Sequence, residues 1–160
     1  MATKIKPAQI AGGDILRIAD LLGGTATLKR SLTSALDAHE MIVHGFPGTV
    51  LTRLAANVSL FQRADVFEKA LGISQRTLQR RKADADPKVL SSEQSGRAWK
   101  FAEVLSKATD VLGTQAEAEQ WLERPAIGLD QHCPIDLLST PAGTELVEQY
   151  LERIEYGVYA

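Results

Sequence analysis

The chain has 160 residues, of which 44% are hydrophobic and 24% are charged, and its formal net charge is −2. This composition is typical of a globular protein, and the length suffices to bury one sizeable core or two small ones. No apolar run approaches the roughly 20 residues that span a bilayer, and the first ten residues lack the apolar stretch of a secretory signal. The sequence therefore predicts a cytoplasmic protein with no membrane partner.

Cysteine and histidine usage excludes two further classes of protein. The single cysteine, Cys133, cannot form an internal disulfide, and the three histidines are scattered without the spacing of metal ligands. We expect no metal and no cofactor. Cys133 should be a buried or half-buried small hydrophobic residue.

The net charge conceals a split along the chain. Residues 1–113 carry 16 Lys and Arg against 11 Asp and Glu, whereas residues 114–160 carry 2 against 9. Such asymmetry indicates two partners of opposite character. The plain alternative is that each part of the chain only keeps itself soluble.

Helical periodicity dominates the chain, and no segment alternates apolar and polar residues as a half-buried strand does. We predict an all-α protein. The first helices should cover Asp14 to Leu22 and Thr27 to His44, and Pro47 should lie in the first turn of a third helix. The apolar stripes of the first two helices either pair two subunits or pack back onto their own domain.

Capping signals mark the later helices. Ser91 with Gln94 should open a long helix that ends at Gly113, and Thr114 with Glu117 should open the next. A last helix should begin at Thr140-Pro141 and end at Gly157. Two tryptophans on these helices belong more naturally to the core than to an interface, namely Trp99 and Trp121.

A helix-turn-helix unit is predicted in the basic part of the chain. Asp65 to Ala70 supplies the first helix, Leu71-Gly72-Ile73 the turn, and Ser74 the cap of the second helix. Glu68 occupies the position near the helix crossing that usually carries a small residue. Four apolar side chains should form the wedge between the helices: Val66, Phe67, Ile73 and Leu78.

The second helix of this unit carries side chains suited to reading DNA. Arg can bind the O6 and N7 atoms of guanine and Gln the N6 and N7 atoms of adenine, whereas Arg81 and Lys82 suit phosphates. The alternative is a basic helix face that only meets solvent. We favour DNA contacts from Ser74, Gln75, Arg76, Thr77, Gln79, Arg80, Arg81 and Lys82.

Three blocks of sequence resemble the Xre/MbcA/ParS family of antitoxins: GISQRTLQRR, LSSEQSGRAWKFAEVLSKATDVLG, and the segment from Trp121 to the C-terminus. The last is the most specific, with Trp-Leu, Pro, Pro-x-Asp-Leu-Leu and Tyr-Gly in order. The resemblance covers Ile42 onwards, and it departs from the usual pattern at Gln131-His132-Cys133.

The resemblance implies an antitoxin whose partner is a RES-domain toxin. Such a toxin consumes NAD or transfers ADP-ribose from NAD. The resemblance also implies autorepression at operator DNA, homodimers, and larger hetero-oligomers with toxin. Within the resemblance, residues 44–113 would hold the helix-turn-helix and residues 114–160 would bind toxin. Residues 1–43 should hold the N-terminal helices, whose possible dimerisation we infer from their apolar stripes alone. The charge split agrees with such a pair of partners.

The C-terminal tail offers a way to block the NAD site of such a toxin. Aromatic rings and a terminal carboxylate can imitate a dinucleotide, so we expect toxin contacts from Tyr156, Gly157, Val158, Tyr159 and Ala160. Alternatively, Tyr156 and Tyr159 only pack on Trp121 or Leu137 to close the core.

The sequence offers no support for catalysis. There is no glycine-rich phosphate loop, no nucleophile with a nearby base, and no carboxylate cluster, so we expect no enzyme. The main rival function is a stand-alone helix-turn-helix repressor without a toxin partner. A third possibility is an adaptor that tethers another protein to DNA without inhibiting it.

Overall fold

The computed structural model describes residues 12–85 and 88–157, and within these ranges it contains helices and no strand. The all-α prediction is confirmed. No helix in the described ranges has the length and apolar character needed to cross a membrane. The elements are α1 Gly12–Leu21, α2 Gly24–Leu28, α3 Ala35–His44, α4 Thr49–Asn57, η1 Ser59–Gln62, α5 Ala64–Leu71, α6 Gln75–Ala83, α7 Ser92–Leu112, α8 Gln115–Leu122, η2 Ile127–Leu129, α9 Pro134–Leu137 and α10 Pro141–Glu155.

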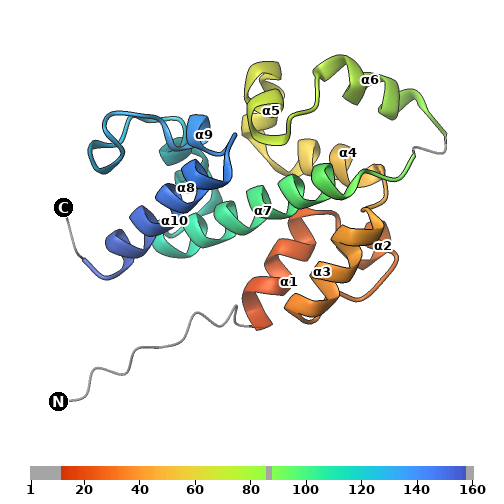
Figure 1. Cartoon of the computed structure of the whole chain (residues 1–160), viewed down its shortest axis with the longest axis horizontal. Helices are drawn as coiled ribbons and strands as arrows, with labels where there is room; N and C mark the ends of the chain where they lie inside the picture. The colour runs from red at the N-terminus through yellow and green to blue at the C-terminus, as the bar shows by residue number, and fades with distance from the viewer. Residues whose placement is uncertain (1–11, 86–87, 158–160) are drawn as a thin grey trace.

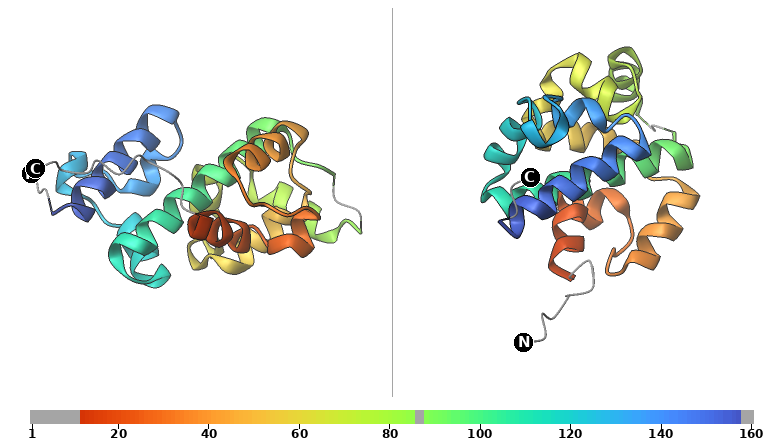
Figure 2. Two further views of the ribbon diagram at one scale, coloured as in Figure 1. Left: turned by 90° about the horizontal axis from the view of Figure 1, so that it is seen from below. Right: turned by 60° about the vertical axis from the view of Figure 1, so that its left-hand side comes forward.

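The long helix α7 is the axis around which the other helices pack. In Figure 1, α1 and α3 lie below α7 and α4 to α6 above it, and Figure 2 shows α8 to α10 around its C-terminal end. The predicted capping box is present, because Ser91 Oγ accepts from Gln94 N and Gln94 Oε1 accepts from Ser91 N. Gly113, with φ 106°, ends α7 where the sequence predicts. α7 therefore packs against α1, α3, α5, α8 and α10.

The predicted continuous helix from Thr27 to His44 is wrong. The chain leaves α2 at Lys29, which has φ 59°, and starts α3 at a second capping box made by Ser34 and Asp37. Asp37 Oδ2 accepts hydrogen bonds from Thr33 Oγ1, Thr33 N and Ser34 N, and these bonds lower the pKa of Asp37. A side chain that satisfies free amides at a helix start favours a new helix over a continuous one.

Most of the apolar stripe residues of the N-terminal helices are buried within the same chain. α1 packs on α7 and α4, α2 packs on α4, and α3 packs on α7. Arg17 of α1 also forms an ion pair with Asp110 of α7. Of the two predicted alternatives, packing back onto the domain accounts for most of the stripe residues, but Leu36 and Val43 of α3 are 65% and 58% exposed and leave apolar surface for a second subunit. The buried stripe residues are Ile15, Ile18, Leu22, Leu28 and Leu32.

A buried carboxylate links the basic and acidic parts of the chain. Glu119 of α8 is only 7% exposed. Its Oε2 accepts from Leu60 N at 3.1 Å, and its Oε1 accepts from Ser59 N at 3.3 Å and from Gln115 Nε2 at 2.8 Å. Side chains from both parts also share one continuous core. The predicted boundary at residue 113 is therefore crossed by close packing.

Four ion pairs among the described residues cross the same boundary; two join α7 to α10, Lys100 with Glu148 and Lys107 with Glu152, and two lie nearer the helix-turn-helix. Lys69 Nζ of α5 lies 3.0 Å from Asp136 Oδ1 of α9, and Arg63 Nη1 lies 2.6 Å from Glu123 Oε1 of α8. The hydrogen bond to Asp136 and the charge of its carboxylate raise the pKa of Lys69. Exposed pairs of this kind contribute little to stability, so their main effect is to fix how α5 meets α8 and α9.

The C-terminal helices begin where the sequence predicts. Thr114 Oγ1 accepts from Glu117 N, and Thr140 Oγ1 accepts from Gly143 N ahead of Pro141. Cys133 is partly buried, as expected, and its thiol donates to Glu123 O. The three residues that depart from the family pattern, Gln131-His132-Cys133, lie in a short loop, and Gln131 has a left-handed backbone conformation there.

Candidate functional sites

The helix-turn-helix forms with the predicted turn and cap. α5 ends at Leu71, and Gly72 adopts φ 67° while its amide donates to Glu68 O at 2.8 Å. Ser74 then caps α6, because its Oγ accepts from Thr77 N at 3.2 Å. The side chain of Glu68 is exposed, so it does not occupy the crossing of the two helices.

The predicted wedge fixes the second helix against the core. Phe67 meets Phe61 edge-on with 5.2 Å between ring centroids, and Phe61 lies 4.5 Å from Phe101 of α7. α6 packs on both α4 and α5. Because α6 has only one buried side chain of its own, its position depends on this wedge. All four predicted wedge residues are buried, namely Val66, Phe67, Ile73 and Leu78.

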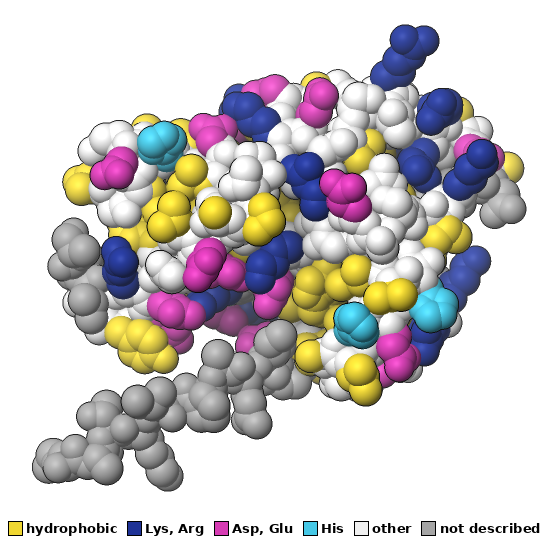
Figure 3. Space-filling model, in the orientation of Figure 1, with side chains coloured by type: hydrophobic (Ala, Val, Ile, Leu, Met, Phe, Trp, Pro, Cys, Tyr) yellow, Lys and Arg dark blue, Asp and Glu magenta, His cyan; other side chains and the backbone are white. Residues whose placement is uncertain are grey.

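The outward face of α6 carries most of the predicted DNA-reading residues. Thr77 is half-buried and its hydroxyl lies 3.0 Å from Ser74 Oγ, so these two residues primarily hold the helix start. Figure 3 shows Lys and Arg side chains gathered over the upper right of the molecule, where Figure 1 places α6. The exposed residues of this face are Gln75, Arg76, Gln79, Arg80 and Lys82.

Two arginines near α6 have intramolecular roles that sequence reasoning missed. Arg81 is half-buried and its Nη1 donates to Lys88 O at 2.8 Å, which ties the end of α6 to the following segment. Arg97 of α7 donates from Nη2 to Lys69 O at 2.9 Å. Glycine suits this turn because residues with a side chain rarely adopt a φ of 67°, and an added Cβ atom would also require the flexible Arg97 guanidinium, 2.3 Å away at Nη1, to shift. Of the predicted DNA contacts, the exposed ones are therefore Gln75, Arg76, Gln79, Arg80 and Lys82 of α6.

The end of α10 presents Tyr156 to solvent. The side chain of Tyr156 is 71% exposed, and Gly157 follows with φ 69° and an amide that donates to Ile154 O at 3.1 Å. The helix therefore ends at the predicted glycine. Packing of Tyr156 on Trp121 or Leu137 is not found. The remaining predicted tail residues, Val158, Tyr159 and Ala160, lie outside the described residues.

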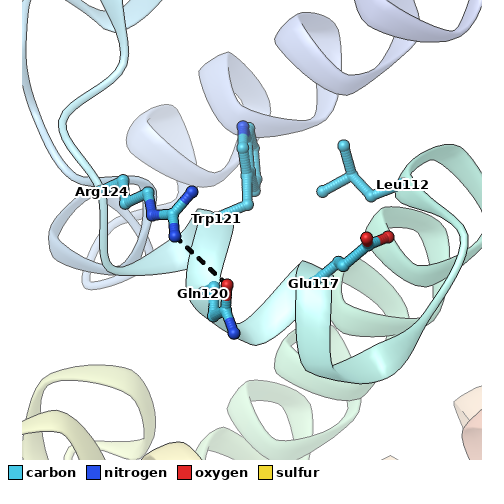
Figure 4. A pocket seen from close by; sticks show the side chains of 5 residues that line it. All are labelled: Leu112, Glu117, Gln120, Trp121 and Arg124. Carbon is cyan, nitrogen blue, oxygen red and sulfur yellow. Dashed lines mark hydrogen bonds between the residues drawn. The ribbon is translucent and has the colours of Figure 1, made fainter.

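Trp121 stacks on Tyr150 of α10. The two ring centroids lie 6.0 Å apart with an interplanar angle of 24°. Trp121 is half-buried, whereas Trp99 is buried as predicted. Beside the stacked pair is a shallow hollow of about 350 Å³, drawn in Figure 4 and lined by Leu112, Glu117, Gln120, Trp121 and Arg124.

The described residues contain no group of three or more His, Cys, Asp or Glu side chains placed to hold a metal ion. The structure instead presents a cationic face on α6 and, in the C-terminal part of the chain, a surface of aromatic and acidic residues. Both are suited to macromolecular partners.

Comparison with known families gives two matches that together cover most of the chain. The family described as antitoxin Xre-like helix-turn-helix domain matches residues 37–103. The family described as antitoxin Xre/MbcA/ParS C-terminal toxin-binding domain matches residues 107–157. The two matches meet inside α7, ahead of Gly113, which agrees with the role of α7 in both parts of the core.

Curated relatives carry consistent names. The chain is 31% identical over 115 residues to Antitoxin Xre of Photorhabdus laumondii, covering 71% of this chain and 75% of the relative. It is 30% identical over 126 residues to Antitoxin Xre of Pseudomonas putida, covering 79% and 76%. It is 28% identical over 136 residues to the Prs ADP-ribosylating antitoxin of a Sphingobium species, covering 79% and 83%.

Proposed function

Since this chain belongs to the Xre/MbcA/ParS family of antitoxins, we propose that it silences a RES-domain toxin by covering the toxin's NAD site and represses its own operon. The observation that carries the proposal is the separation of two surfaces. The cationic face of α6 lies in the helix-turn-helix match, and the exposed end of α10 lies in the toxin-binding match. In this proposal the protein acts in the cytoplasm, by binding and not by catalysis. A stand-alone repressor is disfavoured, because it would have no use for a toxin-binding domain.

Operator binding rests on α6. Its exposed Gln and Arg side chains near the helix start have the donors and acceptors that base edges require, and Arg80 and Lys82 add charge for phosphates. One such helix reads only a few base pairs. A homodimer that places two copies about 34 Å apart would read a complete operator.

Arg76→Ala should weaken operator binding by about 10- to 100-fold and relax the preference at one base pair, because the guanidinium supplies a bidentate base contact. Fluorescence anisotropy with the promoter fragment of the chain's own operon measures the loss. Arg153→Ala, which removes an equal charge from an exposed site on α10, is the matched control and should bind as the wild type does. Unchanged operator affinity in Arg76→Ala would contradict the assignment.

Toxin inhibition rests on the residues that follow α10. Tyr156 is exposed and Gly157 turns the chain away from the helix, which frees the next residues to enter a cleft on a partner. A NAD site presents cations to the pyrophosphate, and the acidic C-terminal part of the chain complements them. The name of the Sphingobium relative also refers to ADP-ribosylation. Each antitoxin dimer would join toxin in a larger hetero-oligomer.

Deletion of Val158 to Ala160 should abolish protection against the toxin while the complex persists. Co-expression with the RES-domain product of the adjacent reading frame tests it, with cell growth, cellular NAD and co-purification as readouts. Deletion of residues 2–4 removes the same number of residues from the other end and should leave protection intact. Full protection by the C-terminal deletion would show that the tail does not act as a plug.

A further inference from the structure

The C-terminal domain carries an exposed apolar surface that lies before the tail in sequence. Ile127 is 77% exposed and Leu146 is 52% exposed, and both lie within the residues of the toxin-binding match. The stacked rings of Trp121 and Tyr150 lie beside them. We call these four residues the Tyr150 ridge. Figure 3 shows hydrophobic side chains gathered at the left of the molecule, which is built from α8 to α10.

The ridge is held in a fixed shape by its backbone. A Cβ atom on Gly128 would lie 2.3 Å from the ring of Tyr150, so the ring rests directly on the chain next to Ile127. Leu146 precedes Tyr150 by one helical turn on α10, which places both side chains on one helix face. Rigid aromatic side chains lose little conformational entropy when a partner covers them, and Trp and Tyr are enriched among the residues that supply most of the binding energy, while neighbouring apolar contacts exclude water.

The ridge is continuous with the tail that the proposed function places in the toxin. Leu146 and Tyr150 belong to the same helix that ends at Gly157, and the span from Leu146 to Gly157 is about 16 Å. A single partner surface can therefore meet both. Residues 114–160 carry 2 Lys and Arg against 9 Asp and Glu, a balance that complements a partner with a cationic NAD site and would repel a second copy of this domain.

We propose that the Tyr150 ridge is the main source of affinity for the toxin, and that the tail supplies inhibition without most of the binding energy. The inference rests on the proposed function, and it assigns binding to the ridge and inhibition to the tail. The apolar ridge docks against an apolar patch beside the toxin's active site. The tail then blocks the site itself.

The test compares variants of the full-length chain for binding to the purified RES-domain product of the adjacent reading frame. Ile127→Asp combined with Leu146→Asp should weaken binding by about 30-fold or more, as expected for a central interface cluster. Leu16→Asp is the matched control, since Leu16 is 59% exposed on α1 outside both family matches, and it should bind normally. Ile127→Asp alone, at the more exposed site, should show part of the loss even if the double variant unfolds.

Three results would overturn the inference. Binding by the double variant within about threefold of the wild type would show that the ridge is not the anchor. If deletion of Val158 to Ala160 weakens binding as much as the double variant does, the tail and not the ridge supplies most of the affinity. Dissociation of the free antitoxin into smaller species by Ile127→Asp would assign the ridge to contacts between copies. Failure of the wild type to bind would instead refute the proposed function.

Discussion

Gly45→Ala is expected to lower the free energy of unfolding by about 3 to 5 kcal/mol, the largest loss among the substitutions considered. Gly45 follows α3 with φ 88° and ψ 134°, a conformation that residues with a side chain rarely adopt. An added Cβ atom would lie 2.1 Å from Leu90 O and 2.7 Å from Val89 Cγ1. The carbonyl cannot move away freely, because Leu90 N donates to Phe46 O at 2.9 Å in the same crossing. Thermal or urea unfolding monitored by circular dichroism measures the change.

Gly113→Ala separates the cost of the backbone conformation from the cost of the clash. Gly113 has φ 106°, and the nearest atom to an added Cβ is the flexible Glu117 Oε2 at 3.4 Å. We expect a loss of only about 1 to 2 kcal/mol there. Equal losses in the two variants would mean that the close approach of Gly45 to Leu90 has no energetic weight. The Gly45 variant should also loosen the segment that Arg81 anchors, and so weaken operator binding.

Glu119→Ala is expected to cost about 3 kcal/mol and to lower the melting temperature by about 6 to 12 °C. The substitution leaves the amides of Ser59 and Leu60 without their acceptor and removes one of the two acceptors of Gln115 Nε2, which also donates to Asn57 O. Leu60 itself is buried, so water cannot readily replace the carboxylate. A buried donor without a partner costs more than the hydrogen bond contributed. Differential scanning calorimetry gives both quantities.

Glu117→Ala is the control for this substitution. Glu117 lies on the same helix with an exposed side chain, so its removal should cost less than about 1 kcal/mol. A melting temperature for Glu119→Ala that matches the Glu117 control would contradict the role of the buried carboxylate. Glu119 joins η1, which leads into the helix-turn-helix, to the toxin-binding match, so its loss should also make the two regions unfold less cooperatively.

Local chemistry made parts of the fold predictable. Ser74 and Ser91 cap their helices as expected, and Gly72 and Gly157 adopt the left-handed backbone that their positions suggested. These signals depend on residues three or four apart, and the physics acts over the same distance. The break before α3 also had a local signal, the pair of Ser34 and Asp37. The helical spacing of apolar residues through that region instead indicated one continuous helix.

The roles of several charged residues depended on distant partners. The sequence predicts that Arg81 binds a phosphate, but in the structure it donates to Lys88 O. Arg97, which lies 25 residues after Gly72 in the sequence, supports the turn from α7. Glu119 resembles any acidic surface residue until α8 is placed against η1. No pattern within one helix reveals which neighbour a long side chain will reach.

By itself, the sequence determined the helical class, the helix-turn-helix with its outward basic face, and the resemblance to antitoxins, because periodicity, caps and motifs are written in nearby residues. The tertiary structure alone decided that most of the N-terminal stripe residues are buried in their own chain, that Tyr150 and not Tyr156 stacks on Trp121, and that Ile127 and Leu146 remain exposed beside them. The reason is that burial is shared between segments far apart in the chain. Which apolar residues are left over for a partner is known only after the core has been filled.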